Sequence, residues 1–186
     1  MKRLLPPLLC LLLLLCASCR HEDSLTQQFN AKAIALQTSG NISTVEYTVQ
    51  KFVKVDDTRW NAFGERKILY SAVAYLKAGI PMEDFSMEDA RIDEHDKSIT
   101  LTLPHAKLIS LNIPPERIRL EYKKSSGLRT EFSDKEKLYI LSQGEKSIRE
   151  DLDDYGILDD AERNARIMFT AILRNIGFEN INIKFA

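Results

Sequence analysis

The sequence has little of what marks the specialised classes of protein. Its 186 residues include 7 glycines, 6 prolines and 3 cysteines, which excludes fibrous, low-complexity and disulfide-rich scaffolds. The net charge is −1, and it becomes −3 (24 basic against 27 acidic residues) once Lys2 and Arg3 are set aside. Such a balance does not produce the strongly basic surface that nucleic acid requires. We therefore expect no nucleic-acid partner.

Motifs for common enzyme chemistry are also missing. The sequence contains no Gly-x-Ser-x-Gly elbow, no phosphate-binding glycine loop and no dinucleotide fingerprint. The histidines, His21, His95 and His105, do not have the spacing of zinc ligands. These absences favour a non-catalytic protein without a cofactor. An enzyme stays an open alternative, because catalytic groups meet in space rather than in sequence.

The first 18 residues have the pattern of a bacterial export signal. Lys2 and Arg3 precede an apolar run over residues 4–15, which is too short to cross a bilayer of about 30 Å as a helix. Residues 15–19 then read Leu-Cys-Ala-Ser-Cys, with small residues directly before Cys19. This order resembles the lipobox, in which the cysteine is acylated and becomes the new N-terminus. We predict a lipoprotein-type signal peptide over residues 1–18.

Lipidation of Cys19 also fits the cysteine count. Cys10 and Cys16 would leave with the signal, so Cys19 would be the single cysteine of the mature chain and would have no intramolecular partner. The alternative is ordinary secretion with Cys19 as a spare thiol. Acyl chains that each gain about 0.8 kcal/mol per buried CH₂ would hold the protein on a membrane. We expect a bacterial cell-envelope location, with the outer membrane favoured and its face left open.

Polar residues after Cys19 predict a tether over residues 19–40. The remaining residues, 41–186, have the length of a single domain. Apolar residues alternate from Val45 to Val55, which predicts a half-buried strand, and the run 66–78 is apolar on both faces, which predicts a central strand. Four shorter strands follow, of which the first two form a hairpin: 90–92, 99–103, 109–113 and 118–122.

Helical periodicity replaces the strand pattern after residue 127. Ser133 and Glu136 form a capping box that begins a helix ending at Gly156, and a second helix begins at Asp159 and ends at Gly177. The buried face predicted for the first helix consists of Leu138, Leu141, Ile148, Leu152 and Tyr155. A last short strand covers residues 181–185. The sequence predicts an α+β fold: a largely antiparallel sheet of about five to seven strands with the helical pair on one face.

Several motifs together resemble a known family. They are Val45-Glu46-Tyr47-Thr48-Val49, Gly64-Glu65-Arg66-Lys67, the run from Ile99 to Pro104, Gly156-Ile157-Leu158, and the closing segment 173–183. This set is similar to the bacterial family catalogued as domain of unknown function 4230, over about residues 41–186. The resemblance implies a shared fold and a membrane anchor, and it carries over no catalytic residues.

The acidic segment 151–162 resembles a calcium-binding EF-hand loop. Gly156 occupies loop position six, and the oxygen ligands would be Asp151, Asp153, Asp159 and Glu162. Tyr155 departs from the pattern at position five, where an oxygen ligand is usual. The alternative is that these acids favour the ends and the solvated face of helices. A calcium- or small-ligand-binding envelope domain is therefore the second functional hypothesis.

Two further features bear on partner binding. Trp60 lies in a polar loop, where it either anchors a protein partner or covers the edge of the core. A basic cluster near residue 120 either contacts membrane phosphate or forms a solvated strand face; it consists of Arg117, Arg119, Lys123, Lys124 and Arg129. The leading hypothesis is an exported lipoprotein whose non-catalytic domain acts through a protein partner at the cell envelope.

Overall fold

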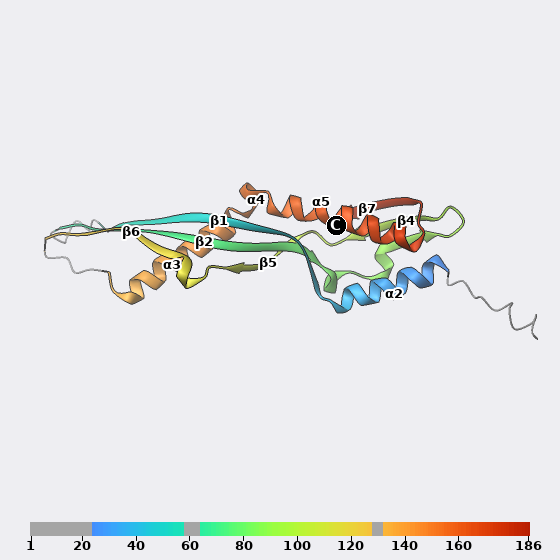
Figure 1. Cartoon of the computed structure of the whole chain (residues 1–186), viewed down its shortest axis with the longest axis horizontal. Helices are drawn as coiled ribbons and strands as arrows, with labels where there is room; N and C mark the ends of the chain where they lie inside the picture. The colour runs from blue at the N-terminus through green and yellow to red at the C-terminus, as the bar shows by residue number, and fades with distance from the viewer. Residues whose placement is uncertain (1–23, 58–63, 128–131) are drawn as a thin grey trace, which may run out of the picture.

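The structure is a computed structural model that describes residues 24–57, 64–127 and 132–186. The predicted signal peptide, Cys19 and Trp60 lie outside these residues. The molecule is elongated, and two long strands, β1 (Asn41–Asp57) and β2 (Arg66–Pro81), run along much of its length (Figure 1). No helix in the described ranges combines the length and the apolar character needed to cross a bilayer.

β2 is the central strand of a four-stranded antiparallel sheet. β1 pairs with one edge of β2 along its whole length, from Asn41 opposite Pro81 to Asp57 opposite Arg66. The other edge of β2 pairs with β5 (Lys107–Asn112) and with β6 (Ile118–Ser125). The central position predicted from two apolar faces is therefore confirmed. The side chains on one face of β2 are buried, and most of those on the other face are partly exposed.

A second sheet has three strands, β3 (Ala90–Asp93), β4 (Ser98–Leu103) and β7 (Asn180–Phe185). β3 and β4 form the predicted antiparallel hairpin, whereas β7 runs parallel to β4. The predicted α+β class is confirmed, as is the final short strand. The seven strands are divided between two sheets, because the segment after β2 turns away from it before β3 begins.

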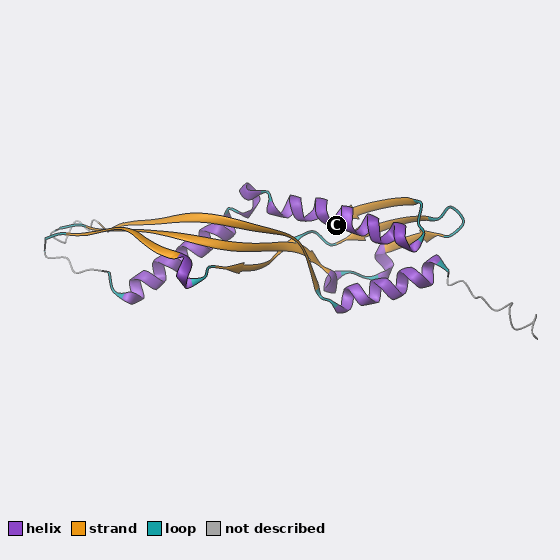
Figure 2. Cartoon of the chain, in the orientation of Figure 1, coloured by secondary structure: helices purple, strands orange, loops and turns teal. Residues whose placement is uncertain are grey.

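The C-terminal helices are α3 (Asp134–Glu150) and α5 (Ile157–Ile176), joined by the short helix α4 (Leu152–Tyr155) (Figure 2). Three single-turn 3₁₀ helices connect strands: η1 (Met82–Asp84), η2 (Met87–Asp89) and η3 (Pro115–Arg117). α5 covers the main core, to which β2 contributes its buried residues from Ala74 to Ile80. α3 covers a smaller core of Ile68, Tyr70, Phe132 and Ile140.

α3 begins at the predicted capping box, but its buried face was predicted correctly only in part: Ile148 is buried as expected, whereas Leu138 is not. Leu138 is 68% exposed, and the buried residues are Ile140, Gly144 and Ile148. A Cβ atom at Gly144 would lie only 2.6 Å from Cγ2 of Val53, so the helix packs on β1 through a position that has no side chain. A search for apolar side chains overlooks such a contact, which explains the error.

The start of α5 also differs from the prediction. Gly156 adopts a left-handed conformation with φ of 66°, and α5 begins at Ile157 rather than at a cap formed by Asp159. Its buried residues, among them Ala165, Phe169 and Ile176, form one stripe along the helix. The helix extends two residues further because Ile157 is itself buried and continues that stripe.

Most of the predicted tether is instead a helix, α2 (Leu25–Thr38). Ser24 and Gln27 form a capping box, and Phe29 and Ala33 are buried against the main core. The i, i+4 spacing of these two residues places them on one helix face. In Figure 1, α2 lies at the end of the molecule opposite to the one where β1 ends and β2 begins. The other end, where β1 ends and β2 begins, is called the hairpin end below. It consists of residues 48–57, 64–73, β6 and α3, and it does not include the β3–β4 hairpin.

Candidate functional site

The acidic segment that resembled a calcium loop is helical in the structure. Asp151 precedes α4, and Asp159 and Glu162 lie in the first turns of α5. Asp151 accepts a hydrogen bond of 2.5 Å from the ammonium group of Lys51 on β1. Glu162 accepts hydrogen bonds from Nδ1 of His105 at 2.8 Å and from the backbone N–H of Ala106 at 3.2 Å. Asp153 and Asp159 are exposed.

These carboxylates do not converge on one point. Over residues 24–57, 64–127 and 132–186, no group of three or more acidic, histidine or cysteine side chains is arranged to hold a metal ion. The structure therefore does not bring together the four residues of the calcium hypothesis. His95, in the β3–β4 turn, and His105, beside Glu162, are exposed and belong to separate surroundings.

Residues of the acidic segment instead form hydrogen bonds that join α4 and α5 to β1. Asp160 accepts a hydrogen bond of 2.5 Å from the hydroxyl of Tyr47. Thr44 donates to the backbone oxygen of Ala161 at 2.8 Å and receives a bond from Asn164 at 3.0 Å. The hydrogen bond to Asp151 raises the pKa of Lys51 above its ordinary value of 10.5, against the opposing effect of burial. The charge of Lys51 is thus retained where it ties β1 to α4.

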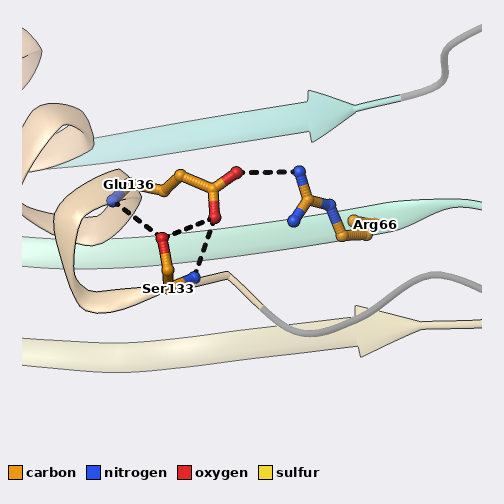
Figure 3. A network of polar contacts seen from close by, with 3 residues as sticks. All are labelled: Arg66, Ser133 and Glu136. Atoms are coloured by element: carbon orange, nitrogen blue, oxygen red, sulfur yellow. Dashed lines mark hydrogen bonds and ion pairs between the residues drawn. The ribbon is translucent and has the colours of Figure 1, made fainter.

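A buried arginine at the hairpin end organises the start of α3 (Figure 3). Arg66 is 6% exposed, lies over the ring of Phe132 at 4.4 Å and contacts Glu136 at 2.9 Å. The other carboxylate oxygen of Glu136 accepts bonds of 2.8 Å from the backbone N–H and the hydroxyl of Ser133. These hydrogen bonds lower the pKa of Glu136 from 4.5 to about 2, and those from Ser133 have a larger effect than the one from Arg66.

A second charged network joins β2 to β6. Glu65 pairs with Lys124, and with Lys67 at 2.9 Å. Hydrogen bonds from Lys124 and then from Lys67 lower the pKa of Glu65 from 4.5 to about 2. The first network joins α3 to the start of β2, and the second joins β6 to it. Together they fix the positions of α3 and β6 at the hairpin end.

Sequence reasoning identified part of the first network. The pair Ser133 and Glu136 was visible as a capping box, because both residues lie within one helical turn. Arg66 was missed, since a basic residue at the start of a strand is usually exposed and nothing local indicates burial. The signal that would find it is the aromatic Phe132 next to the cap, which offers a face for a cation.

Exposed apolar side chains concentrate at the hairpin end. In the described part of the chain, the large exposed apolar residues there are Phe52, Leu120, Tyr122, Leu138 and Tyr139. Elsewhere, Ile34 on α2 and Ile167 on α5 are exposed. A hollow of about 230 Å³ lies beside α3, with Val53, Ala72 and Ile118 among its lining residues. The partner site predicted at Trp60 lies outside the described residues, whereas this surface does not.

Comparison with known proteins gives one match. The family model described as Protein of unknown function (DUF4230) matches residues 35–183, which is most of the chain. Its lower limit falls within α2, so the match includes both sheets and the two long C-terminal helices, except for the last residues of β7. Neither the curated proteins nor the solved structures gave a significant match.

Proposed function

The chain belongs to the DUF4230 family of proteins of unknown function, and from its own residues we propose that it is an exported bacterial lipoprotein of the cell envelope. Cys19 is the anchor in this proposal, and the non-catalytic α+β domain acts by binding a protein partner at the hairpin end. The observation that carries the partner proposal is the concentration of exposed apolar side chains there.

The arrangement of the ends supports this role. Cys19 precedes Ser24, the cap of α2, by only five residues. α2 lies at one end of the elongated molecule and the hairpin end at the other (Figure 1). An anchor at Cys19 would therefore hold the α2 end near the membrane and present the hairpin end to a partner. The outer membrane is the favoured location in this proposal.

We expect Cys19→Ser to abolish membrane anchoring. The serine hydroxyl cannot form the thioether that carries the diacylglycerol, so cleavage after Ser18 should fail and precursor should accumulate. The measurement is labelling with a fatty-acid analogue, read together with the size of the protein on a gel. Cys16→Ser is the matched control, because this cysteine lies within the predicted signal. Labelling that persists in the Cys19 variant would disprove the anchor.

Partner binding at the hairpin end is tested by photo-crosslinking in intact cells. A photoreactive phenylalanine at Phe52 or at Tyr122 replaces an exposed aromatic residue with a similar one. We expect a crosslinked protein adduct of defined mass from both positions. The control position is Ile167, which is 70% exposed but lies on α5, outside the hairpin end. Equal adducts at Ile167, or none at Phe52 and Tyr122, would contradict the proposal.

A further inference from the structure

β6 presents a free edge at the surface of the hairpin end. It pairs with β2 from Ile118 opposite Ala72 to Ser125 opposite Arg66. No strand of the described chain pairs with its other edge, and all of its residues after Ile118 are exposed. A free strand edge carries unpaired backbone donors and acceptors, so it is a template for one more strand.

The charges on β6 distinguish this edge from that of β1. On β1, Lys51 pairs with Asp151, Lys54 with Asp56, and Glu46 with Lys77 on β2. These four charges of β1 are therefore paired within the protein, and hydrogen bonds tie the start of β1 to α5. Arg119 on β6 and Arg117, which ends η3 directly before β6, are in contrast exposed and form no ion pair within the described ranges.

β6 also contains a β-bulge. Tyr70 lies opposite Leu120 and Leu69 opposite Tyr122, so Glu121 is an extra residue in β6. Its carboxylate accepts a hydrogen bond of 2.5 Å from the hydroxyl of Ser71 on β2. Bulges and basic side chains discourage indiscriminate pairing at a strand edge. The same basic charges favour an added strand that is acidic, because they attract its carboxylates, whereas a neutral or basic strand gains no such attraction.

We propose that the partner binds as an extended acidic segment that adds to β6 as a further strand. This inference rests on the proposed function, since the segment belongs to the protein bound at the hairpin end. Ile118 and Leu120 lie opposite Ala72 and Tyr70, on the helix-covered face of the sheet, and Arg119 lies on the opposite face. An added strand with alternating apolar and acidic residues would place each type beside its counterpart.

The test uses two labelled nine-residue peptides and the purified full chain in detergent. One peptide alternates Glu and Val, and the other alternates Lys and Val. We expect the Glu-Val peptide to bind in a fluorescence anisotropy titration and the Lys-Val peptide not to bind. Hydrogen exchange of the backbone amides of β6 should slow when the Glu-Val peptide is present, because strand addition gives these amides new acceptors.

Charge reversal provides the variants for this test. Arg117→Glu combined with Arg119→Glu should weaken binding of the Glu-Val peptide by about tenfold or more, because two exposed attractions are replaced by repulsions. Arg91→Glu is the matched control, since Arg91 is exposed on β3 in the other sheet. Its effect on the affinity should be small.

The outcomes separate this inference from the proposed function. Equal binding of the two peptides, or equal losses in the β6 and Arg91 variants, would overturn strand addition. Binding to vesicles containing phosphatidylglycerol that depends on Arg117 and Arg119, with no binding of the Glu-Val peptide, would assign the arginines to lipid headgroups and overturn it too. Crosslinks at Phe52 and Tyr122 would then still support a partner that binds in another way.

Discussion

Replacing Gly79 with alanine should destabilise the protein by about 3 kcal/mol or more, because it forces apart the two strands on which the fold is built. A Cβ atom at Gly79 would lie 1.9 Å from the carbonyl oxygen of Ile42 and 2.7 Å from Cα of Ser43. Both atoms belong to the backbone of β1, so no rotation of a side chain relieves the overlap. The measurement is urea unfolding of the purified chain, followed by circular dichroism.

Gly40→Ala is the control for this substitution. Gly40 has φ of 71°, and no atom lies within 4 Å of a Cβ built there. Its replacement introduces backbone strain alone and should cost about 1 kcal/mol. If the two alanine variants lost equal stability, the close approach of β1 and β2 at Gly79 would not be the cause.

Replacing Arg66 with alanine should have the next largest effect, a loss of about 3 kcal/mol. The variant loses the charged hydrogen bond to Glu136 and the stacking on Phe132, and it leaves a void in the small core under α3. Because the main core lies under α5, the loss should concentrate at the hairpin end. Hydrogen exchange of α3 should therefore accelerate more than that of α5, and urea unfolding gives the total loss.

Glu136→Gln tests the other side of the same contact through pH. The folded-state pKa of Glu136 is lowered from 4.5 to about 2. Its charge therefore contributes stability that is fully present above pH 4.5 and is lost as the pH falls towards 2. The glutamine variant should depend less on pH across this window than the wild type. Glu65 titrates in the same window in both proteins, so the difference between them isolates Glu136. Identical pH profiles would show that the network contributes nothing.

Local patterns in the sequence predicted most of the elements. Strand alternation placed β1, and two apolar faces identified β2 as the central strand. The capping box at Ser133 placed the start of α3 to the residue. Each of these signals lies within a few residues of the feature that it predicts, because helical and strand periodicity are properties of a short stretch of backbone. The export pattern before Cys19 is of the same kind and stays a prediction.

The tertiary structure decided how the polar residues are used. The acidic segment was interpreted as a calcium loop because its spacing alone was visible. Its partners are Lys51, 100 residues from Asp151, and Tyr47, 113 residues from Asp160. The burial of Arg66 likewise depends on Glu136, which lies 70 residues away. No local pattern specifies such pairs, since they arise only when packing brings distant segments together.

By itself, the sequence determined the class of fold and most strand and helix positions, because these follow from the period of apolar residues and from cap and turn residues. The family was recognised separately, from the resemblance of several motifs. Only the tertiary structure decided that α2 packs on the core, that Gly144 rather than Leu138 faces β1, and that no strand of the described residues pairs with the outer edge of β6. The physical reason is that burial, strand pairing and charge neutralisation depend on distant neighbours.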